Sequence, residues 1–265
     1  MGIQLQDRID QVTGETEGRM TFGEHLEELR SRLLKSIVFL LVAIVVSMAF
    51  YDQLVIFITR PHIQAMQMVK VSEAETKLMP GSYGGPILAV MKLGFIISIF
   101  VSSPWIGYQL WAFVSAGLYK RERRYVATFA PLSFLLFSAG CAFGYIVLVP
   151  VCLAGLARSM SFGGSILSNQ YLFSDYLSLV MMLTIILGAV FQIPLLMVFL
   201  AKTGLVEPST YNKWRRAAII ANVVFAAVVT PADIFTMVIV AVPMLLLYEI
   251  GVILSYLLVQ PKVVR

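Results

Sequence analysis

Three carboxylates crowd the start of the first apolar segment of the chain. The stretch TFGEHLEELRSRLLKS, residues 21 to 36, carries Glu24, Glu27 and Glu28 and runs directly into IVFLLVAIVVSMAF. A membrane anchor uses positive charge at its flank, but it has no need of carboxylates. A carboxylate can hold the planar guanidinium group of an arginine through two parallel charge-assisted hydrogen bonds. These residues therefore indicate either recognition of a basic ligand or a solvated helix with surface ion pairs.

The spacing within this stretch predicts an amphipathic helix over residues 21 to 35. Thr21 followed by Glu24 forms a T-x-x-E capping box, which is typical of a helix N-terminus. One face collects leucines at i, i+3 and i+7 spacing: Leu26, Leu29 and Leu33. Glu28 and Arg32 form an i, i+4 pair in the favourable order.

A further carboxylate lies in YQLWAFVSAGLYKRERRY, residues 108 to 125. Glu122 stands among four basic residues, and aromatic side chains such as Phe113 precede it. Positive loop charge and an aromatic belt at the membrane surface would account for the arginines and the rings, but not for Glu122. Two separate elements on one side of a membrane could together present Glu28 and Glu122 to a basic ligand.

Composition identifies an integral membrane protein. Of the 265 residues 59% are hydrophobic and only 13% are charged, with a mean hydropathy of +0.85. The first 20 residues are polar, so we expect no cleavable signal peptide. Cys141 and Cys152 fall in or beside apolar runs and are expected to be packing residues, with no disulfide and no metal site. The chain contains no HExxH, GxSxG or Walker motif, so we expect neither an enzyme nor a nucleotide-driven transporter, and no cofactor.

Hydropathy predicts six membrane spans. They are residues 33–50, 87–108, 125–149 (ending at Pro150), 176–200, 217–229 and 234–259. Fifteen lysines and arginines fall on the side that holds both termini, against four on the other side, with Lys92 inside a span. The positive-inside rule therefore predicts that both termini are cytoplasmic.

The fifth predicted span is short. A helix of 13 residues rises roughly 20 Å, less than the bilayer core of about 30 Å. Either the helix borrows flanking residues, as in a tilted hairpin, or the membrane thins locally. The fifth and sixth spans are joined by VVTPADIF, which is long enough only for a tight turn.

A series of motifs resembles the TatC family, the multispanning receptor subunit of the twin-arginine protein translocase. The motifs occur in this order: HLEELRSRL at 25–33, RP at 60–61, YQLWAFV at 108–114, LYKRERR at 118–124, FQIP at 191–194, TPAD at 230–233 and PMLLLYEIG at 243–251. Each motif is weak alone, but the set is specific and covers residues 20 to 258.

The resemblance implies a site for the paired arginines of a signal peptide on the cytoplasmic face. Glu28 and Glu122 would contact the arginines, and Phe113 would pack against the apolar part of the peptide. The remaining residues of the implied site match the two cytoplasmic motifs: His25, Leu29, Arg30, Lys120, Arg123 and Arg124. Pro61, in the first extracytoplasmic loop, and Asp233, in the last, would shape the far rim.

The fourth span departs from the family pattern. Where the family often has a glutamate that faces partner helices, this chain has Gln192, two residues before Pro194. Gln192 has no charge to titrate, but it can hydrogen-bond a partner helix in lipid or be satisfied within its own bundle. Glu249, in span six, could either contact a partner or form a structural hydrogen bond, and the sequence does not decide between the two. Lys92 is expected to extend its head group towards the outer interface of the membrane.

The predicted fold is an all-α integral membrane protein, a cupped bundle of six transmembrane helices in which helices five and six are short. Residues 1–20 form a polar tail, residues 21–259 a single membrane domain with its amphipathic cytoplasmic helix, and residues 260–265 a cytoplasmic tail. The resemblance implies export of folded proteins, driven by the proton gradient, across a bacterial inner membrane. The expected partners are twin-arginine signal peptides, single-span TatA/TatB-type subunits, lipid and further copies of the chain, without nucleic acid.

Two other function classes were weighed against this one. A secondary transporter or channel needs polar groups at mid-membrane, yet the spans offer chiefly Gln192 and Asn222, and no internal repeat is evident. An intramembrane enzyme lacks a plausible pair of catalytic residues, because Asp175 and Asp233 lie at span ends and both histidines lie outside the spans.

Overall fold

Helices make up nearly all of the chain that the structure describes. The computed structural model describes residues 22–69, 77–81, 83–117, 123–161, 171–230 and 234–258. Within these ranges no strand forms, and a single parallel bridge joins Met79 to Leu172 between the ends of neighbouring helices. The all-α class predicted from the sequence is confirmed.

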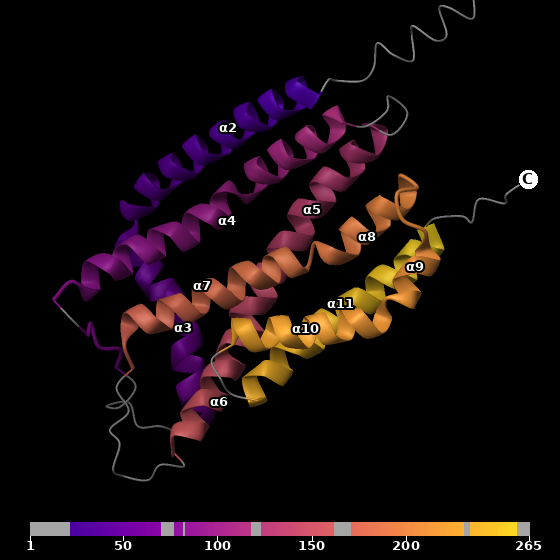
Figure 1. Ribbon diagram of the computed structural model, residues 1–265. Helices are drawn as coiled ribbons and strands as arrows, with labels where there is room; N and C mark the ends of the chain where they lie inside the picture. The colour runs from indigo at the N-terminus through magenta and orange to yellow at the C-terminus, as the bar shows by residue number, and fades with distance from the viewer. Residues whose placement is uncertain are drawn as a thin grey trace, which may run out of the picture.

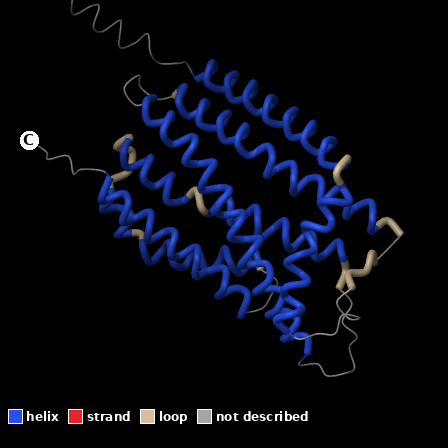
Figure 2. The backbone as a smooth tube through the Cα atoms, turned by 180° about the vertical axis from the view of Figure 1, so that it is seen from behind, coloured by secondary structure: helices blue, strands red, loops and turns tan. Residues whose placement is uncertain are grey.

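The described elements are α2 (Phe22–Met48), α3 (Tyr51–Val69), α4 (Gly85–Ala116), α5 (Arg123–Phe143), the π-helix η1 (Gly144–Leu148), α6 (Val149–Ser161), α7 (Phe173–Val190), α8 (Ile193–Lys202), α9 (Pro208–Lys213), α10 (Arg215–Val229) and α11 (Ile234–Leu258). In Figures 1 and 2, α2 and α4 run side by side along one edge of the molecule, and α10 and α11 lie at the opposite edge.

Five helical segments in the described ranges are long and apolar enough to cross a membrane, so the chain is a multi-pass membrane protein. They are Gly23–Met48, Gly85–Ala116, Val126–Arg158, Phe173–Lys202 and Ile234–Leu258. The predicted fifth span is α10, whose 15 residues rise only about 22 Å. The predicted sixth span is α11, which has 25 residues and is therefore not short.

The N-terminal part differs from the prediction in two ways. The amphipathic segment and the first span form one continuous helix, α2, because no proline or glycine interrupts residues 24 to 48. The segment after it is helical as well: α3 occupies most of the predicted extracytoplasmic loop. Pro61 lies inside α3 and is buried, so it is part of a packed helix and not of an irregular loop.

Prolines shape the two middle spans. Pro150 does not end the third helix, which continues into α6 after a π-helical turn at η1. In that turn Val149 donates its N–H to Gly144 five residues back, a wider ring that accommodates the missing donor of Pro150. Pro194, in contrast, separates α7 from α8 at a short turn that contains Gln192.

Small residues allow the central helices to approach closely. A Cβ atom built on Gly140 of α5 would lie 2.7 Å from the carbonyl oxygen of Leu187, and one on Gly188 of α7 would lie 2.6 Å from Cys141 Sγ. Both distances are too short for a real side chain, so glycine is required at this crossing. Close packing of this kind stabilises helix pairs in lipid, where burial of apolar surface gives no advantage.

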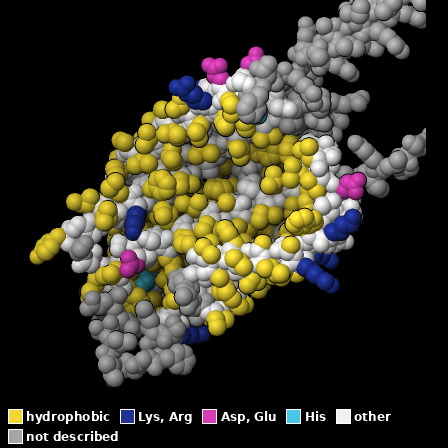
Figure 3. Space-filling model, viewed as in Figure 1, with side chains coloured by type: hydrophobic (Ala, Val, Ile, Leu, Met, Phe, Trp, Pro, Cys, Tyr) yellow, Lys and Arg dark blue, Asp and Glu magenta, His cyan; other side chains and the backbone are white. Residues whose placement is uncertain are grey.

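Charged side chains gather at one end of the molecule. In Figure 3 most of the visible Lys, Arg, Asp and Glu side chains lie near the start of α2 and around α8 and α9, and a smaller group lies at the lower left. Hydrophobic side chains cover most of the visible face between these two regions. That face is hollowed near its centre, over α5. The start of α2 and the end of α4, which carry the motifs HLEELRSRL and YQLWAFV, lie at the charged end (Figure 1).

Candidate functional site

At the N-terminal end of α2, polar side chains and not leucines line the contact with α4. His25, Glu28 and Arg32 recur at i, i+3 and i+7 spacing and are partly buried against α4. The predicted leucine face of the same helix is turned outwards, with Leu26, Leu29 and Leu33 at 49%, 41% and 56% exposure. This arrangement reverses that of a soluble amphipathic helix, whose apolar face packs against the rest of the protein.

Glu28 is held from one side by an arginine of its own helix. Arg32 donates from Nε at 2.9 Å and from Nη2 at 2.5 Å, both to Oε1 of Glu28. Its third donor, Nη1, reaches Oε1 of the buried Gln109 on α4 at 3.2 Å. The predicted i, i+4 ion pair is thus confirmed, and Gln109 ties it to the neighbouring helix.

The second oxygen of Glu28 is buried and accepts no hydrogen bond from any described residue. The same is true of the Nδ1 atom of His25, one turn before Glu28. A buried acceptor without a donor is costly, and the cost is larger for a charged group. The α2–α4 contact therefore leaves a carboxylate oxygen ready for a donor from elsewhere.

An aromatic contact fixes the position of His25. Its ring stacks on that of Phe113 with centroids 4.3 Å apart and planes 17° apart. A Cβ atom on Gly117, at the end of α4, would lie 3.4 Å from Cε1 of His25. The end of α4 therefore lies directly beside the residues around Glu28.

A small aromatic cluster supports this end of α4 from behind. Its buried members come from α4, α5 and α8: Trp111, Phe129, Leu195, Val198 and Phe199. The Trp111 ring meets Phe129 at 5.6 Å and Phe199 at 5.0 Å between centroids. The cluster fixes α4 relative to α5, the two helices that flank the loop containing Glu122.

Several predicted site residues lie away from the α2–α4 contact or outside the described residues. Glu122, Lys120 and Asp233 lie outside the described residues. Arg123 and Arg124 open α5, but their side chains lie outside the description. Leu29 and Arg30 are exposed on α2 and turn away from the contact with α4. Of the predicted signal-peptide residues, the structure brings together His25, Glu28 and Phe113.

Arg32 and Gln109 belong to this site, although the sequence analysis did not assign them to it. Arg32 was recognised only as the ion-pair partner of Glu28, and Gln109 lay unassigned within the quoted YQLWAFV motif. A polar stripe at i, i+3 and i+7 on α2 was the signal available for Arg32. A glutamine in an otherwise apolar span, which must find partners when buried, was the signal for Gln109.

Gln192 is satisfied within its own bundle. Ser133 of α5 donates its hydroxyl to Oε1 of Gln192 at 2.8 Å, and Gln192 donates from Nε2 to the Ser133 carbonyl at 2.9 Å. These two hydrogen bonds correspond to the structural alternative weighed above. Partner docking at Gln192 is not tested by them and stays a prediction.

Pro194 of α8 packs against α11, the helix that carries Glu249. Pro194 is buried, and a Cβ atom on Gly251 of α11 would be 3.1 Å from its Cα. Glu249 forms an ion pair with Arg215 at the start of α10, with both side chains partly exposed. Pro194 therefore packs within the bundle, whereas Glu249 remains partly exposed beside its ion pair.

Tyr211 on α9 fastens this region from the charged end. Its hydroxyl donates to the Met197 carbonyl at 3.0 Å, and its own carbonyl accepts from the Tyr248 hydroxyl at 2.8 Å. Burial, followed by the neighbouring Tyr248, raises the pKa of Tyr211, so the hydroxyl remains a neutral donor.

Lys92 bonds to a neighbouring helix. Its Nζ donates to Ser178 Oγ at 2.7 Å and to the Ser174 carbonyl at 3.2 Å, both in the first turns of α7. The head group therefore does turn towards the helix ends opposite the charged end, where it finds protein oxygens. No group of three His, Cys, Asp or Glu side chains in the described part of the chain could hold a metal ion.

Comparison with known proteins assigns the chain to a family. Residues 24–243 match the family model described as Sec-independent protein translocase protein (TatC). The chain is 35% identical to TatCy of Bacillus subtilis (strain 168) over 240 residues, 89% of each chain. It is 32% identical to TatC of Escherichia coli (strain K12) over 231 residues, 87% of this chain and 86% of that one.

Solved structures support the same family as the family model and the similar sequences. The crystal structure of the twin-arginine translocase receptor TatC superposes with a TM-score of 0.73 at 30% identity, covering 88% of this chain and 98% of that chain. A second crystal structure of that receptor, in DDM, superposes with a TM-score of 0.76 at 29% identity. The expectation of a translocase component and not an enzyme agrees with this family. The chain belongs to the TatC family of Sec-independent protein translocase proteins.

Proposed function

We propose that the chain is the receptor of a twin-arginine translocation system. It binds the paired arginines of signal peptides on folded precursors and organises single-span subunits for export driven by the proton gradient. Family membership and the likeness to a receptor named for twin-arginine translocation support this function.

The observation that carries the proposal is the half-filled carboxylate of Glu28. Arg32 engages Oε1 and leaves Oε2 buried without a donor among the described residues. A guanidinium group from a bound peptide would supply that donor through a charge-assisted hydrogen bond. His25 and Phe113 form a stacked surface beside it for the apolar part of the peptide.

A second carboxylate is needed because Arg32 already neutralises Glu28, and because the ligand has two arginines. Glu122 directly precedes α5 and follows Gly117 by five residues, a stretch that spans at most about 18 Å. Since Gly117 lies beside His25, the loop with Glu122 leaves α4 at the Glu28 site. We assign Glu122 to the second arginine and Lys120, Arg123 and Arg124 to holding the loop at the lipid surface.

The proposed topology has six spans with both termini in the cytoplasm of a bacterial cell, and the protein lies in the inner membrane. The positions of basic residues support it, since the start of α2, the end of α8 and the start of α10, which carry lysines and arginines, lie at the same end of the molecule (Figure 1). α10 is the fifth of these spans, and its 15 residues require either a tilted hairpin with α11 or a thinner bilayer there.

Single-span partners are assigned to the face that includes the α7–α8 junction and α11. Gln192, Pro194 and Glu249 are the proposed contacts there. The hydrogen bonds of Gln192 to Ser133 are compatible with docking, because in lipid the amide can replace one of them with a similar hydrogen bond to a partner helix. Asp233 shapes the opposite rim together with the turn between α10 and α11.

Photocrosslinking of a twin-arginine precursor to the purified protein tests the receptor function. Glu28→Ala and Glu122→Ala are each expected to weaken crosslinking strongly, while the protein stays stably inserted. Glu27→Ala is the matched control, because Glu27 is exposed on the same helix and is one residue from Glu28. Undiminished crosslinking in both variants, or equal loss in the control, would refute the assignment.

A further inference from the structure

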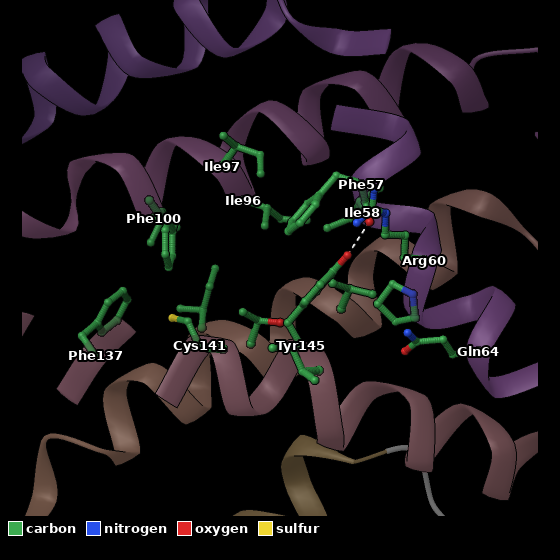
Figure 4. Close-up of a pocket in the computed structure, with 17 residues that line it drawn as sticks. Phe57, Ile58, Arg60, Gln64, Ile96, Ile97, Phe100, Phe137, Cys141 and Tyr145 are labelled. Atoms are coloured by element: carbon green, nitrogen blue, oxygen red, sulfur yellow. Dashed lines mark hydrogen bonds between the residues drawn. The ribbon is translucent and has the colours of Figure 1, made fainter. Parts of the chain in front are cut away.

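A long apolar cavity lies between α3, α4, α5 with η1, and α7, away from the Glu28 site. Its volume is about 400 Å³, within the range of roughly 300–1,000 Å³ typical of ligand sites. Figure 4 shows side chains from both sides of the cavity, with Ile96, Ile97 and Phe100 along α4 and Phe137, Cys141 and Tyr145 along the opposite wall. Nearly all of its lining is hydrocarbon or aromatic ring.

Polar groups gather at one end of this cavity. Arg60 and Gln64, one turn apart on α3, lie at the end opposite Phe137 (Figure 4). Both side chains are exposed, and no acidic residue within the described part of the chain forms an ion pair with Arg60. The Tyr145 hydroxyl nearby is already committed as a donor to the Phe57 carbonyl. The cavity thus has apolar walls along its length and a cationic end, where Arg60 has no acidic partner among the described residues.

The cavity opens sideways onto the outer surface of the molecule. Three of its lining side chains are also well exposed: Phe57 at 45%, Phe100 at 45% and Ile146 at 62%. In a chain that crosses the membrane, side chains exposed around an apolar opening face lipid. An occupant can therefore enter from the bilayer without opening the bundle.

The length and the chemistry of the cavity suit a phospholipid. From Tyr145 to Phe137 the wall rises eight residues, roughly 12 Å at 1.5 Å per residue, so an extended acyl chain can lie along it. Its cationic end and its opening towards the bilayer match a lipid that carries a phosphate beside its acyl chains.

We propose that this cavity binds an acyl chain of a membrane phospholipid, whose phosphate is held by Arg60 and Gln64. The guanidinium group of Arg60 can hold two phosphate oxygens at once, and the Gln64 amide can donate to a third. Because the bound acyl chain would lie along both α3 and η1, the lipid would link α3 to the π-helical turn of the third span. π-Helical turns occur frequently at functional sites, and this one forms part of the cavity wall.

Photolabelling from the lipid itself tests the proposal. The protein is placed in nanodiscs of phosphatidylethanolamine with a trace of phosphatidylglycerol that carries a diazirine in its acyl chain. After irradiation, labelled peptides are mapped by mass spectrometry. Adducts are expected to concentrate on the peptides that hold Phe100, Phe137 and Cys141, well above those of the lipid-facing side of α10 around Val228, which is 74% exposed.

Two kinds of variant link the label to this cavity. Ala142→Trp and Ile146→Trp fill the cavity from exposed positions and should reduce cavity adducts to the level seen on α10. Arg60→Gln should lower them about tenfold, the loss expected for a charge-assisted hydrogen bond, and Arg60→Lys should restore part of the yield. Lys77→Gln is the control, an exposed basic residue outside the cavity.

The result that would overturn the proposal is equal labelling of the cavity and α10 in the unaltered protein. Cavity adducts that persist in variants with normal thermal unfolding would also overturn it. A single-span protein subunit found crosslinked at Cys141 would show that a helix is the occupant. If either tryptophan variant fails to fold, Arg60→Gln decides alone, since its exposed side chain supports no packed core.

Discussion

Two polar sites in this apolar molecule differ in whether all their hydrogen bonds are made within the protein. We call the site around Glu28 the open site and the site around Gln192 the closed site. At the α2–α4 contact, Glu28 keeps one buried oxygen without a described partner. At the junction of α7 and α8, Gln192 exchanges two hydrogen bonds with Ser133. A buried group without a hydrogen bond costs free energy, so the open site is suited to accept a donor from a ligand. The closed site, in which both bonds are made, is suited to stabilise the bundle.

The largest effect is expected when the open site loses both carboxylates. Glu28→Ala combined with Glu122→Ala should weaken binding of a twin-arginine peptide by about a hundredfold or more, since each charge-assisted contact contributes roughly tenfold. Fluorescence anisotropy of a labelled peptide with detergent-solubilised protein measures this. Glu24→Ala combined with Glu27→Ala removes the same charge from the same region and should leave affinity within about threefold of the parent. Equal losses in the two double variants would contradict a specific site.

Breaking the closed site should reduce stability and not peptide binding. Gln192→Leu leaves the Ser133 hydroxyl without its partner and should cost about 1–2 kcal/mol of unfolding free energy. Ser133→Ala removes one of the two bonds and should cost less, about 0.6 kcal/mol. Thermal unfolding in detergent gives the order, and an unchanged midpoint in Gln192→Leu would show that the pair is not structural.

The same two variants separate bundle stability from partner docking. If Gln192 also contacts a single-span partner, co-purification of that partner falls in Gln192→Leu but is kept in Ser133→Ala, which retains the amide. Equal retention in both variants would leave Gln192 a structural residue only.

A smaller effect is expected from the residue that supports the open site. Gln109→Leu removes the acceptor of Arg32 Nη1 and loosens the ion pair that orients Glu28. Peptide affinity should weaken by about threefold, the typical value of one net hydrogen bond at a partly exposed site. Preference for a twin-arginine over a twin-lysine peptide should fall with it. An unchanged preference with full affinity would show that Arg32 positions Glu28 without help from α4.

The smallest effect is expected at the ion pair of Arg215 and Glu249. Both side chains are more than a third exposed, so either Arg215→Gln or Glu249→Gln should change unfolding free energy by less than about 1 kcal/mol. A loss of partner co-purification in Glu249→Gln alone would then report docking. A large drop in stability in both would instead make the pair structural.

Most of the fold could be predicted from the sequence because hydropathy dominates in a membrane. Four of the six predicted spans needed only extension at one or both ends, as in α4, which runs to Ala116 and not Tyr108. Prolines were the weaker signal: Pro150 was expected to end a helix, yet the π-helical turn absorbs its missing donor. The helix α3 was missed because its mixed composition resembles a loop, and only packing against α6 and α4 stabilises it.

The candidate site was only partly predictable. Glu28 and its ion pair with Arg32 followed from helical spacing, and the stack of His25 on Phe113 joins two motifs that were quoted separately. Gln109 could not be assigned, because its role depends on the rotation of α4 relative to α2, which tertiary packing decides. The outward direction of the leucine face could not be predicted either. Leucines at i, i+3 and i+7 give the same pattern whether the face packs on protein or contacts lipid.

The most direct test of the receptor account is a double-mutant cycle between Glu28→Gln and an arginine-to-glutamine change at each signal-peptide arginine. If Glu28 receives one of them, the two changes are coupled by about 1.5 kcal/mol or more for that arginine, and the effect of the peptide change nearly vanishes in Glu28→Gln. Effects that add to within about 0.5 kcal/mol for both arginines would contradict the account.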